Sequence, residues 1–179
     1  MSKPPLPLAI EHALLGFLQA GPLHGYEIDA RLRLPDGLGQ VWRLKQPHLY
    51  ALLTKLEAAA LIQAEIIAQD ARPTKRLLQL TPQGKQTFAD WLVAPVKHGR
   101  DFRIEFLAKL FWAHHQSHRV TALVAAQTAV TSTWLARLEQ TAAVHPPHSY
   151  NWRVAHFRIG QVQATLAWLP LCLPSGSTS

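Results

Sequence analysis

The sequence predicts a mainly α-helical fold with one small β-hairpin, and three observations lead to this prediction. Apolar residues recur at helical spacing over most of the chain, as in Leu49, Leu52, Leu53 and Leu56. Two short apolar runs, LIQAEIIAQD and LLQLT, flank the basic segment ARPTKR, which is the pattern of two strands joined by a charged turn. The composition, with 48% hydrophobic and 16% charged residues, is that of a folded protein.

The N-terminal half begins with two predicted helices. Apolar residues recur at i, i+4, i+7 and i+8 from Ile10, which predicts a helix near residues 8–20. Gly21-Pro22 ends it, because proline disfavours a helical conformation in the residue before it. A second, short helix is predicted over residues 26–32. The segment 35–44 contains proline and two glycines and is predicted as a loop.

The third helix is predicted over residues 45–62, with Pro47 well placed in its first turn. The β-hairpin follows, and Thr81 and Pro82 are the expected N-cap and first residue of a closing helix. Three helices, a two-stranded wing and a closing helix make a winged helix-turn-helix. We assign this domain to residues 1–95.

Residues 96–170 are predicted to form a second, helical domain. Its helices are expected near residues 101–114, 118–143 and 150–169, and His145-Pro146-Pro147 separates the last two. Residues 171–179 are expected to be a flexible tail.

The last helix carries an apolar seam at alternating spacings of three and four, which is typical of helices packed at a coiled-coil angle. This seam could pack on the chain's own 118–143 helix or on a second copy. We favour a homodimer, in which the seam packs on a second copy of the chain. The predicted interface residues are Trp152, Ala155, Ile159, Val162, Leu166 and Leu169.

The single Cys172 excludes an internal disulfide and fits a reducing compartment. Residues 1–10 lack the apolar core of a secretory signal, and no apolar stretch is long enough to span a bilayer. We therefore expect a cytoplasmic protein without a membrane partner. The formal charge of +7 is distributed unevenly: residues 1–95 hold ten Lys or Arg and eight Asp or Glu, so their positive charge is local rather than general.

The outward face of the predicted third helix carries Pro47, Ala51, Thr54 and Lys55 and contains no acid. Small residues and hydrogen-bond donors near a helix start suit entry into the major groove of DNA, and cations at a wing tip suit phosphates or a narrow minor groove. An ordinary exposed helix face and a solubilising turn are the alternatives. The predicted contacts to double-stranded DNA are Lys45, Gln46, His48, Tyr50, Thr54, Lys55, Arg72, Lys75 and Arg76.

Four stretches carry a family resemblance: LLGFLQAGPLHGYEI (14–28), LYALLTKLEAAALI (49–62), RPTKRLLQLTPQG (72–84) and FLAKLFWA (106–113). In this order, they resemble the PadR-like transcriptional regulators. The resemblance implies a winged-helix repressor that dimerises through C-terminal helices and responds to small aromatic or drug-like effectors near the dimer interface.

The aromatic residues of the second half fit such an effector site or an ordinary core, and both interpretations stay open. The candidates for contact with a small hydrophobic effector are Phe102, Phe106, Trp112 and Trp134. His114, His115 and His118 lack accompanying Cys, Asp or Glu, so a solvated turn is favoured over a metal site. No nucleophile elbow, P-loop or dinucleotide fingerprint is present, and we expect neither an enzyme nor a cofactor. The alternative functions are a protein-interaction module without DNA binding and a metal-responsive regulator.

Overall fold

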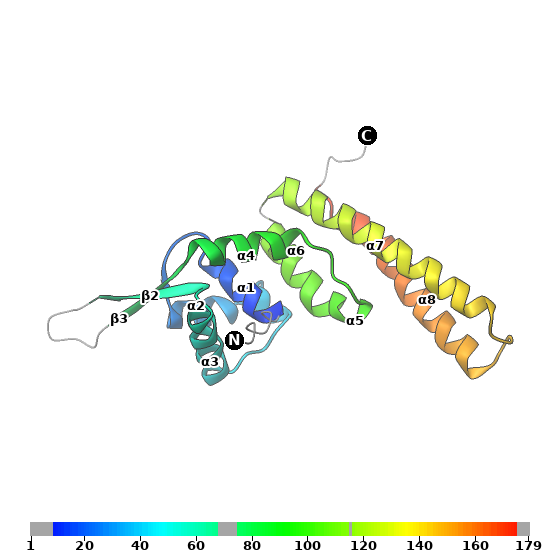
Figure 1. Cartoon of the computed structure of the whole chain (residues 1–179), viewed down its shortest axis with the longest axis horizontal. Coiled ribbons are helices and arrows are strands. Elements are labelled where there is room, and N and C mark those ends of the chain that lie inside the picture. Colours follow the sequence, from blue (N-terminus) through cyan, green and yellow to red (C-terminus); the bar gives the residue numbers. More distant parts are fainter. Residues whose placement is uncertain (1–8, 68–74, 115, 175–179) are drawn as a thin grey trace, which may run out of the picture. The chain divides into compact units, whose positions relative to one another are not determined.

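The computed structural model of the chain describes residues 9–67, 75–114 and 116–174 (Figure 1). The chain forms two compact units. One comprises Met1–Leu92 with Arg103–Trp112, and the other comprises Val93–Phe102 with Ala113–Ser179. The predicted fold class, mainly helical with a small β-hairpin wing, is confirmed.

The first unit is built on helices α1 (Ala9–Phe17), α2 (Gly25–Leu32), α3 (Gln46–Ala58) and α4 (Pro82–Val93). A short 3₁₀ turn, Leu38–Gln40, lies in the segment predicted as a loop. The helices meet in an apolar core, because each buries the stripe that its sequence periodicity predicts. α3 ends at Ala58, a turn earlier than predicted, and Ala60 with a φ of 56° turns the chain into the hairpin.

The sheet of the first unit has three antiparallel strands in the order β1-β3-β2: β1 (Leu23–His24), β2 (Ile62–Ile67) and β3 (Lys75–Leu80). β2 pairs with β3 along its whole length, so the predicted hairpin is confirmed. β1 pairs Leu23 with Leu78 and was not predicted, because two residues are too few to show a periodicity. The predicted turn residue Arg72 lies outside the described residues.

The junction of the hairpin and α4 is tightly held. Thr81 donates its hydroxyl to the carbonyl of Ala60 at 2.7 Å and accepts from the amide of Gly84 at 3.0 Å, so the predicted N-cap is confirmed. A side chain at Gly84 would place its Cβ 1.9 Å from the carbonyl oxygen of Leu61, so this helical turn can approach the strand only with glycine. This contact fixes the wing against α4.

The segment 99–113 is helical throughout, as α5 (Gly99–Asp101), a π-helical turn (Phe102–Phe106) and α6 (Leu107–Ala113). Residues 103–112 belong to the first unit, although the predicted boundary at residue 95 assigned them to the second. They contribute the fully buried Phe106 and Lys109 to that unit.

Lys109 is buried beside two groups of its own unit. Its Nζ lies 2.8 Å from Glu105 Oε1 and 5.2 Å from the ring centre of Trp91, whose indole nitrogen also donates to Glu105. Burial lowers the pKa of Lys109, and the hydrogen bond and charge of Glu105 oppose that shift. The lysine therefore belongs to the interior of the first unit and is not a surface cation.

The second unit is a helical hairpin of α7 (Ser117–Ala143) and α8 (Tyr150–Trp168), followed by the 3₁₀ helix η3 (Leu169–Cys172) (Figure 1). The two long helices run antiparallel beside each other. Buried Gln127 of α7 accepts from the amide of Val96 at 2.8 Å, which ties the segment after α4 to this hairpin. No described helix is long and apolar enough to cross a membrane.

Part of the α8 seam packs on α7 within the chain, and the predicted dimer interface stays a prediction. Ala155 and Ile159 are buried in one cluster with Ala142 of α7, and Leu135 and Leu138 pack against that cluster. Leu169 is also buried. These three seam residues are at most 8% exposed in the single chain, and Ala155 and Ile159 face the antiparallel α7. Trp152, Val162 and Leu166 are half-buried, and their contact with a partner stays a prediction.

Candidate nucleic-acid interface

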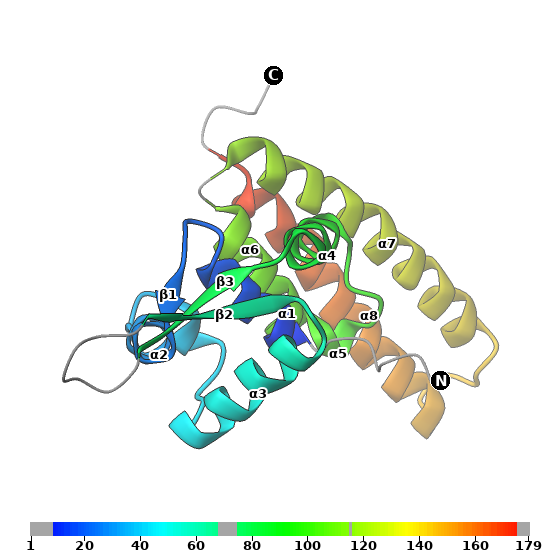
Figure 2. The same cartoon turned by 60° about the vertical axis from the view of Figure 1, so that its left-hand side comes forward.

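Helix α3 has one buried and one exposed face. Leu49, Leu52, Leu53 and Leu56 are buried in the first unit, and burial of each leucine contributes about 1.5–3 kcal/mol. This anchoring holds the other side of the helix toward solvent (Figure 2). The exposed residues are Lys45, Gln46, Pro47, His48, Tyr50, Ala51, Thr54, Lys55 and Ala58.

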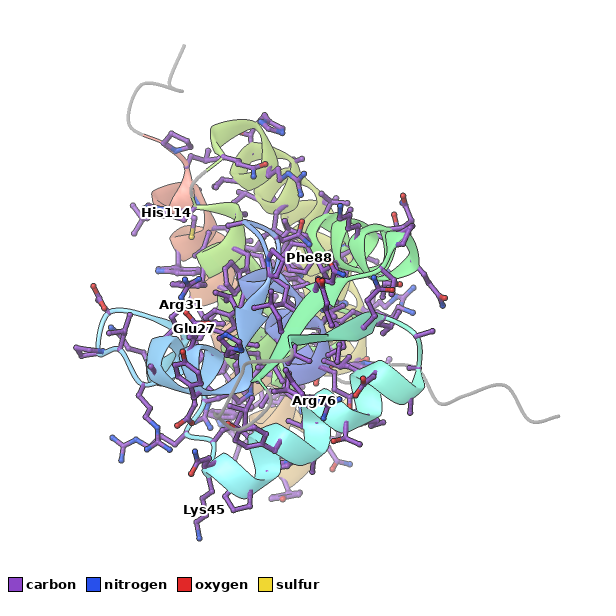
Figure 3. The ribbon with its side chains drawn as sticks, turned by 90° about the vertical axis from the view of Figure 1, so that its left-hand side faces the viewer. Glu27, Arg31, Lys45, Arg76, Phe88 and His114 are labelled. Carbon is purple, nitrogen blue, oxygen red and sulfur yellow. The ribbon has the colours of Figure 1, made fainter. Side chains whose placement is uncertain are left out.

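The start of α3 presents polar and cationic groups without an acid. Lys45 is the N-cap residue, with extended backbone angles, and its side chain projects away from the helix (Figure 3). Gln46 and His48 are exposed in the first turn. The amide groups of a helix start carry partial positive charge, so this end of α3 is electrostatically suited to an anion.

Thr54 and Tyr50 are joined one turn further along the helix. Thr54 donates its hydroxyl to the carbonyl of Tyr50 at 3.0 Å, and its side chain is exposed. The Tyr50 ring lies against Gly25 at the start of α2, where an added Cβ would come within 2.8 Å of ring atom Cε1. Tyr50 therefore spans the first turn of α2 and the outer face of α3.

Lys55 has a partner inside the first unit. Its Nζ lies 2.6 Å from Oε1 of Glu11, and the Glu11 side chain is only 2% exposed whereas that of Lys55 is 46% exposed. A buried carboxylate needs a neutralising partner, so the first role of Lys55 is to stabilise α1 against α3. The sequence indicated a phosphate contact and gave no sign of this pairing, because the two residues are 44 positions apart.

Arg76 on β3 is also paired. Its Nη2 lies 2.5 Å from Oε2 of Glu57, the one acid in α3, and Figure 3 shows Arg76 beside that helix. The backbone carbonyl of Arg76 is 2.8 Å from Nδ1 of His24. A carbonyl only accepts, so Nδ1 carries the proton in this contact. Of the remaining wing cations, Lys75 is described only in its backbone, opposite Ile67, and Arg72 lies outside the described residues.

A small cleft separates α3 from the wing. It has a volume of about 60 Å³ and is lined by one aromatic ring, apolar side chains and the paired charges. Its residues are Gly25, Tyr50, Leu53, Thr54, Glu57, Arg76 and Leu78. Residues of α2, α3 and β3 thus meet around this one cleft within the first unit.

The four aromatic candidates for an effector site divide between the two units. Phe106 is fully buried in the first unit, as a core residue. Trp112 lies in the same unit, edge-on to Phe17 at 5.0 Å, and its indole nitrogen is buried without a partner among the described residues. Phe102, edge-on to Trp168 at 5.9 Å, and Trp134 belong to the second unit.

Histidines do not gather into a metal centre in the part of the chain that the structure describes, which has no group of three or more His, Cys, Asp or Glu placed to hold an ion. His114 and His118 are exposed near the start of α7. His115 lies outside the described residues.

Comparison with known proteins finds sequence similarity in the N-terminal part of the chain. Residues 14–90 match the model of the transcriptional regulator PadR-like family. The match covers less than half of the chain, so the similarity to this family concerns its N-terminal part.

Individual relatives are more distant. The chain is 31% identical to the negative transcriptional regulator PadR of Bacillus subtilis over 103 residues, which are 58% of this chain and 56% of that protein. It spans about half the length of the curated relatives it matches. Crystal structures of B. subtilis PadR with operator DNA and with p-coumaric acid are each 24% identical and cover 92% of this chain, with 98% and 96% of theirs and TM-scores of 0.46 and 0.44.

Proposed function

We propose that this PadR-like chain is a DNA-binding transcriptional regulator that acts as a homodimeric repressor. The observation that carries the proposal is the outer face of α3, which is exposed, free of acids from Lys45 to Leu56, and rich in small residues and donors. Such a face can enter a major groove without steric or electrostatic repulsion. A cytoplasmic location is part of the proposal, because it would follow from DNA binding.

Residues of the interface would divide between base reading and phosphate binding. Gln46 and His48 lie in the first turn of α3 and Thr54 lies in its third turn, and we assign all three to base edges; the exposed Thr54 could place its methyl group against a thymine methyl. Lys45 at the helix start, with Arg72 and Lys75 of the wing, would contact phosphates. Tyr50 is held by Gly25, and we place it at the edge of the interface without choosing between these roles.

Dimerisation would use the free side of α8 in place of its buried seam. Tyr150 and Phe157 of α8 are seven residues apart, Leu171 of η3 follows fourteen residues after Phe157, and the three are 80%, 66% and 79% exposed. Ala164 completes this heptad spacing and would let a second helix approach closely. A second copy of the chain packed along this face would remove three large apolar side chains from water and pair two recognition helices for an inverted repeat.

A small aromatic effector would modulate operator affinity. Two observations support an effector site. Aromatic residues are frequent between Phe102 and Trp134, and the buried indole nitrogen of Trp112, which has no hydrogen-bond partner among the described residues, could donate to a ligand oxygen. B. subtilis PadR has been crystallised with p-coumaric acid, so phenolic acids are the first compounds to test. Tryptophan fluorescence would report binding, and loss of operator affinity on addition of the compound would establish gating.

The proposed function is tested by fluorescence anisotropy with two duplexes, one carrying an inverted repeat from upstream of the chain's own coding region and one scrambled. Thr54→Ala should cost about 1–3 kcal/mol on the operator and little on the scrambled duplex. Lys75→Ala should weaken both and lower the salt slope by about 0.9. If the wild type binds neither duplex at low salt, a protein-interaction module becomes the better interpretation.

A further inference from the structure

Glu57 of α3 and Arg76 of β3 form an ion pair, which is the one salt bridge between α3 and the wing among the described residues. The distance between Arg76 Nη2 and Glu57 Oε2 is 2.5 Å, and the two side chains are 57% and 33% exposed. Glu57 is the one acid of α3, a helix that otherwise carries only polar, apolar or cationic groups. An acid at this place is unexpected on a surface that suits a polyanion.

The surroundings hold this pair in place. Arg76 is fixed through its backbone carbonyl by His24 and through its β3 position by pairing with Ile66, whereas Glu57 lies one turn after Leu53 in a helix anchored by buried leucines. Both charged residues line the cleft between α3 and the wing. The pair is therefore an ion pair that joins α3 to β3 within the first unit.

We propose that Glu57 limits sequence-independent DNA affinity by neutralising Arg76. The inference rests on the proposed DNA-binding function. A guanidinium has five N–H donors, so Arg76 can keep Glu57 on one edge and meet a phosphate with another. In that arrangement the phosphate faces an electrically neutral pair, and Arg76 releases no counterion of its own.

The consequence concerns the free protein. Sequence-independent binding depends on the number of phosphates neutralised, and non-specific sites on a genome far outnumber operators. Holding one interface cation neutral lowers the affinity for all DNA and leaves more protein free to find the operator. Glu57 is thus a positioning residue that sets the charge of the interface through Arg76.

The test measures the salt slope of binding to the scrambled duplex for the wild type, Glu57→Gln, Arg76→Ala and the double variant. Gln retains an oxygen that can accept from Arg76, so it removes the charge and keeps the contact. Glu57→Gln should steepen the slope by about 0.9 and raise affinity about eightfold near 0.1 M salt, the effect of one additional counterion released. Arg76→Ala should reduce the slope by about 0.9, and the double variant should return it to the wild-type value.

Asp90→Asn on α4 is the matched control. It changes the net charge of the same unit by the same amount, at an exposed residue whose carboxylate accepts from Gln86 and has no cationic partner among the described residues. It should alter the slope by much less than Glu57→Gln. A slope for Glu57→Gln equal to that of the wild type or of Asp90→Asn would overturn this inference alone. Absence of wild-type binding would overturn the proposed function together with it.

Discussion

Lys55 has two alternative roles, as a contact to DNA phosphate or as a stabilising partner of Glu11. It lies on the outer face of α3 but is paired with Glu11 of α1. As a phosphate contact, it could be replaced without harm to the fold. As the partner of a buried carboxylate, it could not. We predict that Lys55→Met, which keeps most of the apolar stem, destabilises the protein.

The magnitude follows from the exposure of the two groups. Removing one member of a fully buried ion pair costs about 3–5 kcal/mol, because the other charge is left in a poorly solvated place. Glu11 is 2% exposed, but Lys55 is 46% exposed, so water already screens one end of this pair. We therefore expect the free energy of unfolding to fall by about 2–3 kcal/mol.

The assay is urea unfolding followed by circular dichroism. Lys85→Met on α4, where the lysine is exposed, is the control and should change stability by less than about 0.5 kcal/mol. The double variant Glu11→Gln/Lys55→Met should be more stable than Lys55→Met, since it removes the charge left without its partner. If Lys55→Met has the same free energy of unfolding as Lys85→Met, the pairing with Glu11 does not stabilise the fold. A role of Lys55 as a phosphate contact would then be the better interpretation.

Three further substitutions test other parts of the account. Gly84→Ala should destabilise the first unit by about 2 kcal/mol or more in urea unfolding, because the new Cβ would lie 1.9 Å from the rigid carbonyl of Leu61; near-wild-type stability would contradict the close approach. Gln127→Ala leaves the buried amide of Val96 without its acceptor and should cost about 1–3 kcal/mol, whereas a neutral result would mean that water replaces the side chain. Phe157→Asp should shift the mass in light scattering from dimer to monomer while helicity is unchanged, and a persistent dimer would place the interface elsewhere.

Much of the fold could be predicted from the sequence because its elements are amphipathic and well punctuated. The leucine stripe of α3, the Thr81 cap and the breaker before α8 are local signals, and the structure contains all three. The two-residue strand β1 has no such signal. Periodicity also predicts which face of α8 is buried but not what covers it, and α7 covers Ala155 and Ile159 within the chain.

The exposed side of α3 could be predicted from the sequence, but the ion-pair partners of its cations and of the wing cations could not. Exposure of Gln46, His48 and Thr54 follows directly from the helical period. The partners of Lys55 and Arg76 lie on other elements, 44 and 19 residues away, and only the tertiary fold brings them together. Counting cations along the sequence therefore overestimates the charge that α3 and the wing present to DNA.

The central claim is that the outer face of α3 enters DNA, and an acid placed on that face tests it most directly. Ala51 is exposed in the middle of the face, so Ala51→Glu should leave stability unchanged and place a carboxylate against the groove. Ala136→Glu, at an exposed position of α7, changes the net charge equally. In anisotropy titrations with the operator duplex, we predict that Ala51→Glu loses affinity by at least about a hundredfold, the effect of several kcal/mol, whereas Ala136→Glu binds nearly as the wild type. Equal affinity of the two variants would contradict the claim.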